Sequence, residues 1–555
     1  MSVNEKTIKL LEKKITTAAK KAFPDASIPN FLVEVPKERS HGDYSTNIAM
    51  LLAKPLRRAP RDIAGEIANE FVYDELVLQA DVAGAGFINF QLNPSYIYEV
   101  LREIEVLGEN YGRVNLGAGK KVMVEFVSAN PTGPMHMGNA RGGAIGDCLS
   151  SLLDMAGYNV TREFYVNDAG AQIEKFGRSL EARYIQLLTG EGDFPEDGYQ
   201  GEDITERARE FIKLNGDNLL SLSSDERQKK LVEYALPLNL DDIKNNLKKY
   251  RIEYDTWFRE SSLYQSGELG ETIEALKKSE YAYEKDGALW FKSSEFGAEK
   301  DDVLVRANGI PTYFAADIAY HRNKFLSRGF DIAINIWGAD HHGHIARMKG
   351  AMKSLGIDPE RLCIITMQLV RLMENGETVR MSKRTGKMIT LADLLEEIGI
   401  DAARFFFNLR QAGSHFEFDL GLALEQSNDN PVFYVQYAHA RICSIIRLLE
   451  QEGVSERPFD KIDPARLATS FEIDLIKKLG DLPDEISAAA QSYEPSRLTR
   501  YVMDTSALFH SFYNECRIKG EDEETASARL KLASAAKTVI ANVLNMLGVT
   551  APERM

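Results

Sequence analysis

Apolar runs of strand length alternate with amphipathic helical patterns through the middle of the chain. The runs occupy residues 121–127, 160–166, 331–337 and 362–370, and helical patterns occupy 137–155 and 344–355. This alternation is typical of strand–helix–strand units, which build a parallel sheet covered by helices. We therefore expect an α/β domain with a parallel sheet over residues 113–420. Ligands of such sheets bind at the loops after the carboxyl ends of the strands.

Two regions of different character flank this domain. Residues 1–112 begin with an amphipathic helical pattern and end in a short apolar strand, so we expect an α+β domain there. Residues 421–555 carry apolar stripes at helical spacing without strand-like runs, which predicts an all-α bundle. An acidic stretch at 191–206 holds seven carboxylates and no Lys or Arg. We interpret it as part of a surface insertion over about 180–265.

The overall charge limits the classes of partner. The chain holds 67 Lys and Arg against 83 Asp and Glu, a net charge of −16, which argues against a protein that coats nucleic acid indiscriminately. Residues 1–62 carry twelve basic and seven acidic residues, so local nucleic-acid contacts stay open. The four cysteines are widely spaced, and no apolar run approaches the ~18 residues of a membrane span. We expect a cytoplasmic protein without a membrane segment or a tightly bound structural metal.

One strand-to-helix junction has the features of a ligand-binding loop. The segment VEFVSANPTGPMHMGNARGG places two prolines after the strand, and His136, Gly138 and Asn139 at the start of the following helix. The unpaired N–H groups at a helix N-terminus suit a phosphate or an adenine-bearing ligand, and Gly138 leaves room for close approach. The alternative is a capped helix with an incidental histidine.

A cationic loop lies 242 residues further on, counted from Asn139 to Met381. The segment TVRMSKRTGKM concentrates Arg380, Lys383, Arg384 and Lys387 beside Ser, Thr and Gly. A cationic loop of this kind stabilises pyrophosphate as it leaves an α-phosphorus. By itself the segment is equally compatible with an exposed basic turn. Neither a P-loop nor the G-x-G-x-x-G dinucleotide motif is present.

Together, these motifs resemble the two signatures of the class I aminoacyl-tRNA synthetases. P-x-H-x-G-N after the first strand is similar to HIGH, and R-M-S-K-R late in the same domain is similar to KMSKS. The segments GDYSTNIAMLLAK, AGFINF, GADHHGH, DNPVFYVQYAHARI and the terminal APERM resemble the arginyl-tRNA synthetase family in the same order. The resemblance covers essentially the whole chain. It implies a Rossmann-like catalytic domain between an added N-terminal domain and a helical anticodon-binding domain.

The resemblance implies a ligase whose substrates are L-arginine, ATP as its Mg²⁺ complex, and tRNA(Arg). Arginyl-adenylate forms first, and the arginyl group then passes to the 2′-hydroxyl of the terminal adenosine, with bound tRNA required for activation. His136, Gly138 and Asn139 then match ATP-binding positions, and Lys383 matches the lysine that stabilises the phosphoryl transition state. Two departures are Asn139 for the last histidine of HIGH, and Arg380 and Arg384 for the outer residues of KMSKS.

A guanidinium is planar and always charged, so carboxylates are its best partners. Pro311 is expected as a first helical residue, after which Tyr313, Asp317 and His321 share one helical face. Tyr313 could pack on a guanidinium plane while Asp317 accepts from its nitrogens; the alternative is a structural ion-pair helix. Glu125 and Asn130 match family positions that hold the amino acid. The resemblance assigns the loop GADHHGH to ATP and to arginine, with Asp340 and His341 as the candidate residues, and leaves open which of them contacts which substrate. A metal site is the alternative.

The tRNA contacts implied by the resemblance lie outside the central domain. Phe87 and Asn89, on one face of a strand, match positions that contact the tRNA elbow. Tyr434, Tyr437 and Met555 resemble an anticodon-facing set, with core packing as an alternative for both tyrosines. Rival functions are another class I synthetase, a nucleotidylyltransferase, and a non-catalytic RNA-binding relative. We expect a monomer.

Overall fold

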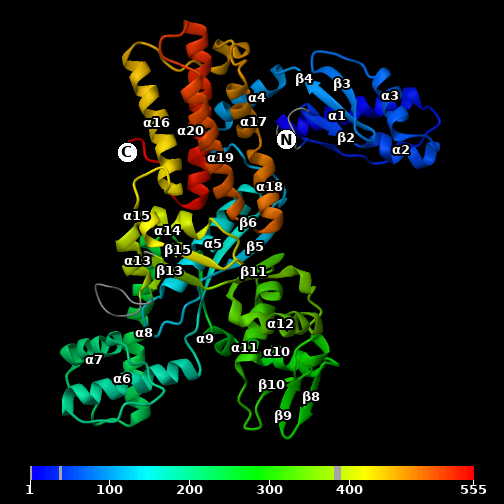
Figure 1. The fold of residues 1–555 in the computed structure, drawn as a ribbon. Helices are drawn as coiled ribbons and strands as arrows, with labels where there is room; N and C mark the ends of the chain where they lie inside the picture. Colours follow the sequence, from blue (N-terminus) through cyan, green and yellow to red (C-terminus); the bar gives the residue numbers. More distant parts are fainter. Residues whose placement is uncertain (1–2, 37–40, 375, 380–388) are drawn as a thin grey trace.

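The structure is a computed structural model that describes residues 3–36, 41–374, 376–379 and 389–555. At its centre lies a five-stranded parallel sheet in the order β12-β11-β5-β6-β7 (Figure 1). Its strands are β5 (Lys121–Glu125), β6 (Asn159–Val166), β7 (Thr256–Arg259), β11 (Ile332–Gly338) and β12 (Leu362–Met367). The predicted parallel-sheet domain is thus confirmed. Because the chain runs outward from β5 to β6 and later returns to place β11 on its other side, the strand order reverses between β5 and β11.

Helices cover both faces of this sheet. Helix α5 (Met137–Met155) joins β5 to β6, whereas α11 (Tyr313–Arg322) and α12 (His342–Ser354) belong to a second apolar core. Side chains of β11 alternate between the two cores: Ile334 packs with the α5 core and Ala333 with the α11–α12 core. Gly146 of α5 lies directly against Phe126, since a Cβ there would come within 2.5 Å of the Phe126 Cβ. Glycine therefore permits the close approach of α5 to the end of β5.

The insertion forms a separate helical unit, which lies at the lower left of Figure 1. Its helices are α6 (Ala171–Thr189), α7 (Glu202–Asn215) and α8 (Ser224–Lys249), and they enclose a core of their own that includes Phe176, Tyr184 and Phe211. Strand β7 lies inside the range 180–265 expected for the insertion, yet it pairs with β6 as an edge of the main sheet. The sequence pattern did not distinguish strand β7 from the helical insertion that precedes it.

Two small sheets extend the central domain. One is antiparallel and contains β8 (Ala282–Lys285), β9 (Ala288–Phe291) and β10 (Asp302–Val305), beside α9 (Ser261–Gln265) and α10 (Glu268–Lys277). The other contains β13 (Val370–Glu374), β14 (Glu377–Val379) and β15 (Phe416–Asp419). Helices α13 (Leu391–Ile398) and α14 (Ile400–Phe407) share an apolar core with it. The single strand expected over 362–370 is wrong, because β12 ends at Met367 and β13 belongs to the second small sheet.

The flanking regions fold in the classes predicted for them. The N-terminal region is an antiparallel sheet of four strands with helices, in the order α1 (Val3–Ala22), β1 (Val33–Glu34), β2 (Tyr44–Thr46), α2 (Ile48–Leu56), α3 (Pro60–Asn69), β3 (Val77–Ala83) and β4 (Phe87–Leu92). The C-terminal region contains α15 (Leu420–Leu424), α16 (Pro431–Gln451), α17 (Ser470–Gly480), α18 (Leu482–Ser492), α19 (Ser496–Glu515) and α20 (Glu523–Leu547). The α+β and all-α expectations are both confirmed.

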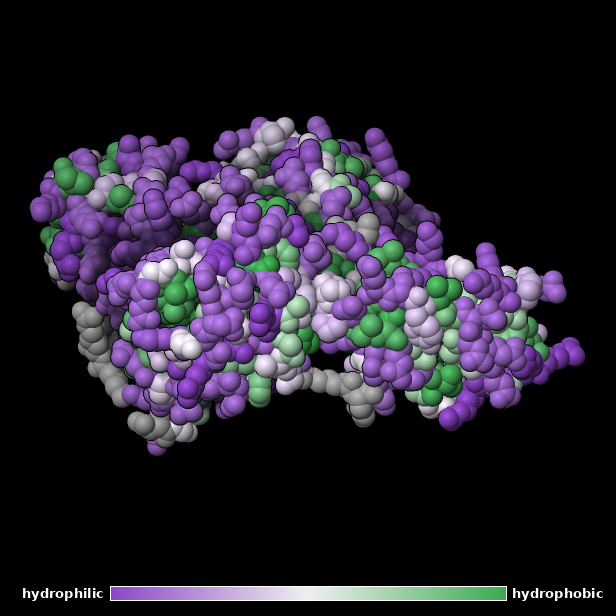
Figure 2. Space-filling view, turned by 90° about the horizontal axis from the view of Figure 1, so that it is seen from above, coloured by the Kyte–Doolittle hydropathy of each residue, from purple (hydrophilic) through white to green (hydrophobic). Residues whose placement is uncertain are grey.

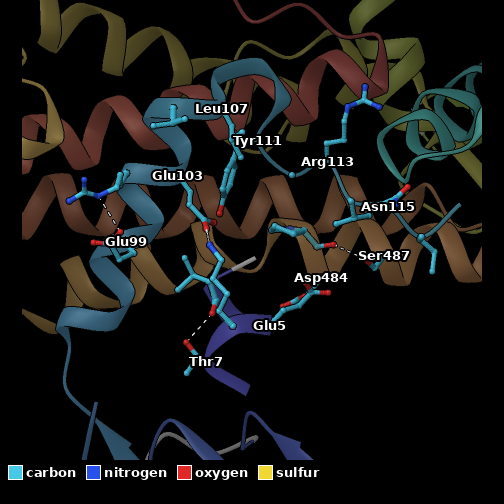
Figure 3. A pocket seen from close by; sticks show the side chains of 18 of the residues that line it. Glu5, Thr7, Glu99, Glu103, Leu107, Tyr111, Arg113, Asn115, Asp484 and Ser487 are labelled. Carbon is cyan, nitrogen blue, oxygen red and sulfur yellow. Dashed lines mark hydrogen bonds and ion pairs between the residues drawn. The ribbon is translucent and has the colours of Figure 1, made fainter. Parts of the chain in front are cut away.

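Helix α4 (Ser95–Leu107) and the loop after it join the three regions. The buried hydroxyls of Tyr98 and Tyr111 donate to the carbonyls of Leu467 and Leu479 in the helical region, at 2.9 and 3.0 Å. A cavity of about 1400 Å³ lies between α1, α4 and α18, and Figure 3 shows Glu103, Tyr111 and Asp484 around it. Figure 2 shows a mainly hydrophilic face with small, separate apolar groups. Within the described residues, no helix is long and apolar enough to cross a membrane.

Arg404 of α14 connects the central domain to the helical region. Its side chain is fully buried, and it forms an ion pair with Asp147 of α5 and donates to the carbonyls of Leu547 and Tyr250 at 2.8 and 2.9 Å. Because a buried guanidinium must satisfy all its donors, this residue fixes α5, the end of α8 and the end of α20 relative to one another.

Arg404→Met should lower the free energy of unfolding of the central domain by about 3–5 kcal/mol, because it leaves buried acceptors without their donor. The three tryptophans, Trp257, Trp290 and Trp337, all lie in the central domain, so their fluorescence during urea unfolding measures this change. The control is Arg113→Met, which removes the exposed ion pair with Asp154. The control substitution should lower the free energy of unfolding by less than about 1 kcal/mol. Equal urea midpoints for the two variants would contradict the prediction.

Candidate active site

The end of strand β5 carries an unusual backbone turn. Val127 and Ser128 have φ values of 68° and 41°, in the left-handed region that costs a non-glycine residue of order 1–3 kcal/mol. The Ser128 hydroxyl donates to Glu125 Oε1 at 3.2 Å and accepts from the Tyr165 N–H at 3.1 Å. These bonds hold the strained turn against β6, so the loop that follows leaves the sheet in one fixed direction.

The histidine and the asparagine of the following motif lie where the sequence predicts, at the start of α5. The Asn139 side-chain oxygen accepts from the His136 N–H at 3.1 Å. Because its carbonyl is used in this way, the Asn139 amide nitrogen remains as the donor. The backbone here is hydrogen-bonded to the segment that follows the cationic loop in the chain. The Met137 N–H donates to the Ile389 carbonyl at 3.2 Å, and the Leu391 N–H donates to the Met135 carbonyl at 3.0 Å. Gly138 has open space beside its Cα.

A cavity of about 790 Å³ lies over this loop. The residues that line it from the central domain include Ser128, Asn130, Thr132, Gly133, His136, Asn139 and Thr390. The opposite wall belongs to the insertion and includes Tyr199, Glu202 and Asp203. Burial raises the pKa of Asp203 above its ordinary value, and the nearby Glu206 adds to the rise. The cavity has the size of a nucleotide site, and the start of α5 with His136 and Asn139 lies along one side of it.

A smaller cavity of about 230 Å³ lies next to the first. It is lined by Tyr165, Asn167, Gln172, Glu260, Tyr313 and Asp317. Gln172, near the start of α6, lines both cavities. A ligand with two parts can therefore extend from one cavity into the other.

The structure brings Tyr313 and Asp317 together in the smaller cavity, on successive turns of α11. The Tyr313 hydroxyl accepts from the Ala171 N–H at 2.7 Å, which fixes the ring over the start of α6. Asp317 Oδ2 lies 3.2 Å from His344 Nε2. Helix α11 begins at Tyr313 with Thr312 as its N-cap, so the expectation that Pro311 is a helical residue is wrong.

Glu260 completes this cavity, and sequence reasoning missed it. Burial raises its pKa to about 7, with the carboxylates of Asp317 and Asp168 adding to the rise. Glu260 follows β7, at the carboxyl end of that strand. Recognition of residues 256–259 as a sheet strand, rather than as part of the insertion, would have pointed to it.

Glu125 and His321 lie behind the cavities and line neither of them. Glu125 Oε2 accepts from Lys324 Nζ at 2.6 Å and from the Tyr320 hydroxyl at 3.1 Å, all of them buried. His321 Nδ1 donates to the Asp317 carbonyl at 2.8 Å, and its Nε2 accepts from the Asn335 amide at 2.9 Å. Burial keeps the pKa of His321 well below its ordinary value, so the ring is neutral.

The remaining predicted site residues lie at three other places. Asn130 is exposed on the loop of the larger cavity. Asp340 and His341 follow β11 and have exposed side chains, with Asp340 Oδ2 and His341 Nε2 3.6 Å apart. Lys383, with Arg380, Arg384 and Lys387, lies outside the described residues. Among the residues that the structure does describe, no group of three His, Cys, Asp or Glu is arranged to hold a metal ion.

The residues predicted to contact tRNA lie in the two regions that flank the central domain. On β4, Phe87 is half-buried, while Asn89 is buried and accepts from the Ser45 hydroxyl at 2.8 Å. On α16, Tyr437 is 37% exposed, and the terminal Met555 is 54% exposed. Core packing therefore does not account for Tyr437.

An aromatic cluster that the sequence analysis did not identify surrounds the two tyrosines. The Tyr434 ring lies 4.9 Å from that of His510, and the Arg441 guanidinium lies 4.3 Å from the Tyr513 ring centre. Burial and, to a smaller extent, the nearby Arg441 lower the pKa of His510 to about 4, so this ring is neutral. Aromatic rings beside a guanidinium suit unstacked bases.

Comparisons with known proteins follow the same division of the chain. Residues 9–92 match the family described as arginyl tRNA synthetase N terminal domain. Residues 101–410 match tRNA synthetases class I (R), catalytic domain, and residues 435–555 match the DALR anticodon binding domain. The central match alone covers more than half of the chain.

Relatives match over nearly the full length. The arginine–tRNA ligase of Caldanaerobacter subterraneus is 61% identical over 530 residues, covering 95% of this chain and 94% of the relative. The arginine–tRNA ligase of Acetivibrio thermocellus is 57% identical, and its match covers 100% of both chains. The solved structure of Thermus thermophilus arginyl-tRNA synthetase has the same fold, with a TM-score of 0.74 at 22% identity over 99% of this chain and 100% of that one. The chain belongs to the arginyl-tRNA synthetase family of class I aminoacyl-tRNA synthetases.

Proposed function

We propose that this chain is an arginine–tRNA ligase that activates arginine with ATP and transfers it to tRNA(Arg). The observation that carries the proposal is the small cavity with two carboxylates, Asp317 and Glu260. Within the described residues, neither carboxylate forms an ion pair with a Lys or Arg side chain. The guanidinium of a bound arginine is a suitable cationic partner for these carboxylates, because it offers them fixed pairs of donors and presents a flat face to the ring of Tyr313.

The arrangement of the two cavities supports the activation step. With its guanidinium in the smaller cavity, the arginine backbone extends past Gln172 toward the larger cavity, where ATP enters as its Mg²⁺ complex. An oxygen of the arginine carboxylate attacks the α-phosphorus, the bond to the bridging oxygen breaks, and pyrophosphate leaves. His136 and the Asn139 amide donate to phosphate oxygens, and Gly138 leaves space for them. Lys383 stabilises the charge that develops on the leaving group.

Other predicted residues complete the proposed amino-acid and nucleotide sites. Asn130 holds the amino-acid backbone from the rim of the larger cavity. Asp340 contacts ATP and His341 contacts arginine from the end of β11. Glu125 acts through Ser128, whose hydroxyl it binds, and so supports the strained turn beside the amino acid.

The second step uses tRNA held by both flanking regions of the protein. The terminal 2′-hydroxyl attacks the carbonyl of arginyl-adenylate, and AMP leaves. Phe87 and Asn89 contact the tRNA elbow, while Tyr434, Tyr437 and Met555 contact the anticodon together with Arg441 and Tyr513. We further propose that activation requires bound tRNA(Arg), and that the enzyme acts as a monomer in the cytoplasm.

The test of the proposed function is ATP–pyrophosphate exchange with each amino acid, with and without tRNA(Arg). Asp317→Asn should raise the arginine KM by about 10–100-fold and leave the ATP KM within about twofold, because it removes one charged partner of the guanidinium. Asp331→Asn, at the opposite end of β11, is the matched control. Exchange with another amino acid would refute the proposed function, whereas an unchanged arginine KM would remove only Asp317 from the pocket.

The pKa of Glu260 predicts how arginine binding depends on pH. Its carboxyl is raised to about 7, and only the ionised form attracts a guanidinium, so the arginine KM should fall as the pH rises through about 7 and then level off. Glu260→Gln should raise the arginine KM and abolish this step. Profiles of the arginine KM between pH 6 and 8.5 measure both effects, and an equal step in Glu260→Gln would assign the ionisation to another group.

Lys383→Ala should lower kcat for exchange by about 10²-fold or more while changing both KM values little, because the lysine acts on charge that develops only in the transition state. Lys387→Ala, in the same cationic loop, is the comparison. Single-turnover formation of arginyl-adenylate measures the step directly. Retention of the wild-type rate by Lys383→Ala would contradict the proposal for this lysine.

A further inference from the structure

His344 lies directly behind the carboxylate of Asp317. It belongs to α12, its side chain is 11% exposed, and its Nε2 lies 3.2 Å from Asp317 Oδ2. The Asp317 side chain is 40% exposed and lines the small cavity. One carboxylate oxygen is therefore held from behind while the carboxylate stays accessible to a ligand.

The other nitrogen of His344 faces Arg347, one turn along α12. Arg347 Nε donates to His344 Nδ1. A guanidinium has donors only, so Nδ1 must be the acceptor, and the ring proton must lie on Nε2. This tautomer gives Asp317 a hydrogen bond from Nε2–H.

Arg347 is itself fixed from two sides. Its Nη1 donates to Asp302 Oδ1 at 2.8 Å, and its guanidinium lies 5.2 Å from the ring centre of Phe314. Asp302 begins β10, in the antiparallel sheet, so a third element holds the chain of bonds in place. The His344 ring contacts the rings of Trp337 and Phe314, whose centres are 5.4 and 5.7 Å away, and these contacts limit its rotation.

The charge of this arrangement matters for a cationic substrate. A protonated His344 would place a cation against the carboxylate that the substrate guanidinium needs, and it would direct an N–H at the Arg347 donor. A neutral Nε2–H donor orients the Asp317 carboxylate without cancelling its charge.

We propose that Arg347 and His344 are positioning residues for arginine specificity, in which Arg347 fixes the His344 tautomer and His344 orients Asp317 toward the substrate guanidinium. The proposal rests on the proposed function, since it assigns the cavity at Asp317 to the guanidinium. Neither side chain lines the cavity, so both act through Asp317 rather than by direct contact.

The kinetic test uses three variants of the full-length protein in tRNA-dependent ATP–pyrophosphate exchange. Arg347→Met, which removes the donor to Nδ1, should raise the arginine KM about tenfold and leave the ATP KM within about twofold. Arg347→Lys, which keeps a donor, should restore most of the loss. Lys349 lies on the same helix as Arg347 and forms an ion pair with Glu360, outside that helix. Lys349→Met, which breaks this ion pair, should leave both KM values unchanged.

A spectroscopic test does not depend on variant activity. In ¹⁵N-histidine-labelled wild-type protein, the resonance assigned to His344 by its absence in His344→Phe should show a protonated Nε2 and an unprotonated Nδ1. An Nδ1–H tautomer in the wild type, or an unchanged arginine KM in Arg347→Met, would overturn the proposal. Absence of arginine-dependent exchange in the wild type would refute the proposed function instead, so the two failures are distinguishable.

Discussion

The buried ion pair between Glu125 and Lys324 is the interaction on which the site depends. A buried charge is costly unless it is paired and its remaining hydrogen bonds are satisfied. Here Glu125 is at the end of the central strand, and Lys324 is in the π-helical turn Asn323–Ser327 that follows α11. Lys324 also donates to Asn335 at 3.0 Å, and Asn335 in turn contacts His321 of α11. The pair therefore fixes α11 relative to the end of β5, and α11 carries Tyr313 and Asp317 into the small cavity.

The same network separates structural charges from those left for a substrate. The Arg328 side chain pairs with Glu163, and Tyr320 donates to both Glu125 and Glu163, so these carboxylates are occupied within the protein. Asp317 and Glu260 have no such cationic partner in the described part of the chain. Because the pKa of Glu260 is raised to about 7, a cation that enters the cavity favours its ionised form and adds to the negative charge there. This contrast between satisfied and unsatisfied carboxylates favours a basic amino acid over a neutral one.

The net charge of −16 takes on a different meaning once the residues are placed. Part of the acidity lies in the insertion, where Glu202 and Asp203 form one wall of the larger cavity. The proposed tRNA contacts instead rely on aromatic rings and Arg441 of the helical region. This region is joined to helix α5 through Arg404 and Asp147. Local stacking and a few cations are sufficient for a discriminating tRNA ligase, and the overall acidity disfavours binding of other RNA.

The sequence by itself determined the parallel-sheet domain, its helical and α+β neighbours, and the loop with His136 and Asn139, because strand and helix periodicity and helix-start signals are local properties. It also placed Tyr313 and Asp317 on one face of a helix. Only the tertiary structure decided that Glu125 is paired behind the site, that Glu260 enters the cavity from β7, and that His344 supports Asp317. These residues are separated by up to 219 positions in the chain, counted from Glu125 to His344. Burial, pairing and pKa depend on which segments pack together, and local sequence patterns do not encode that.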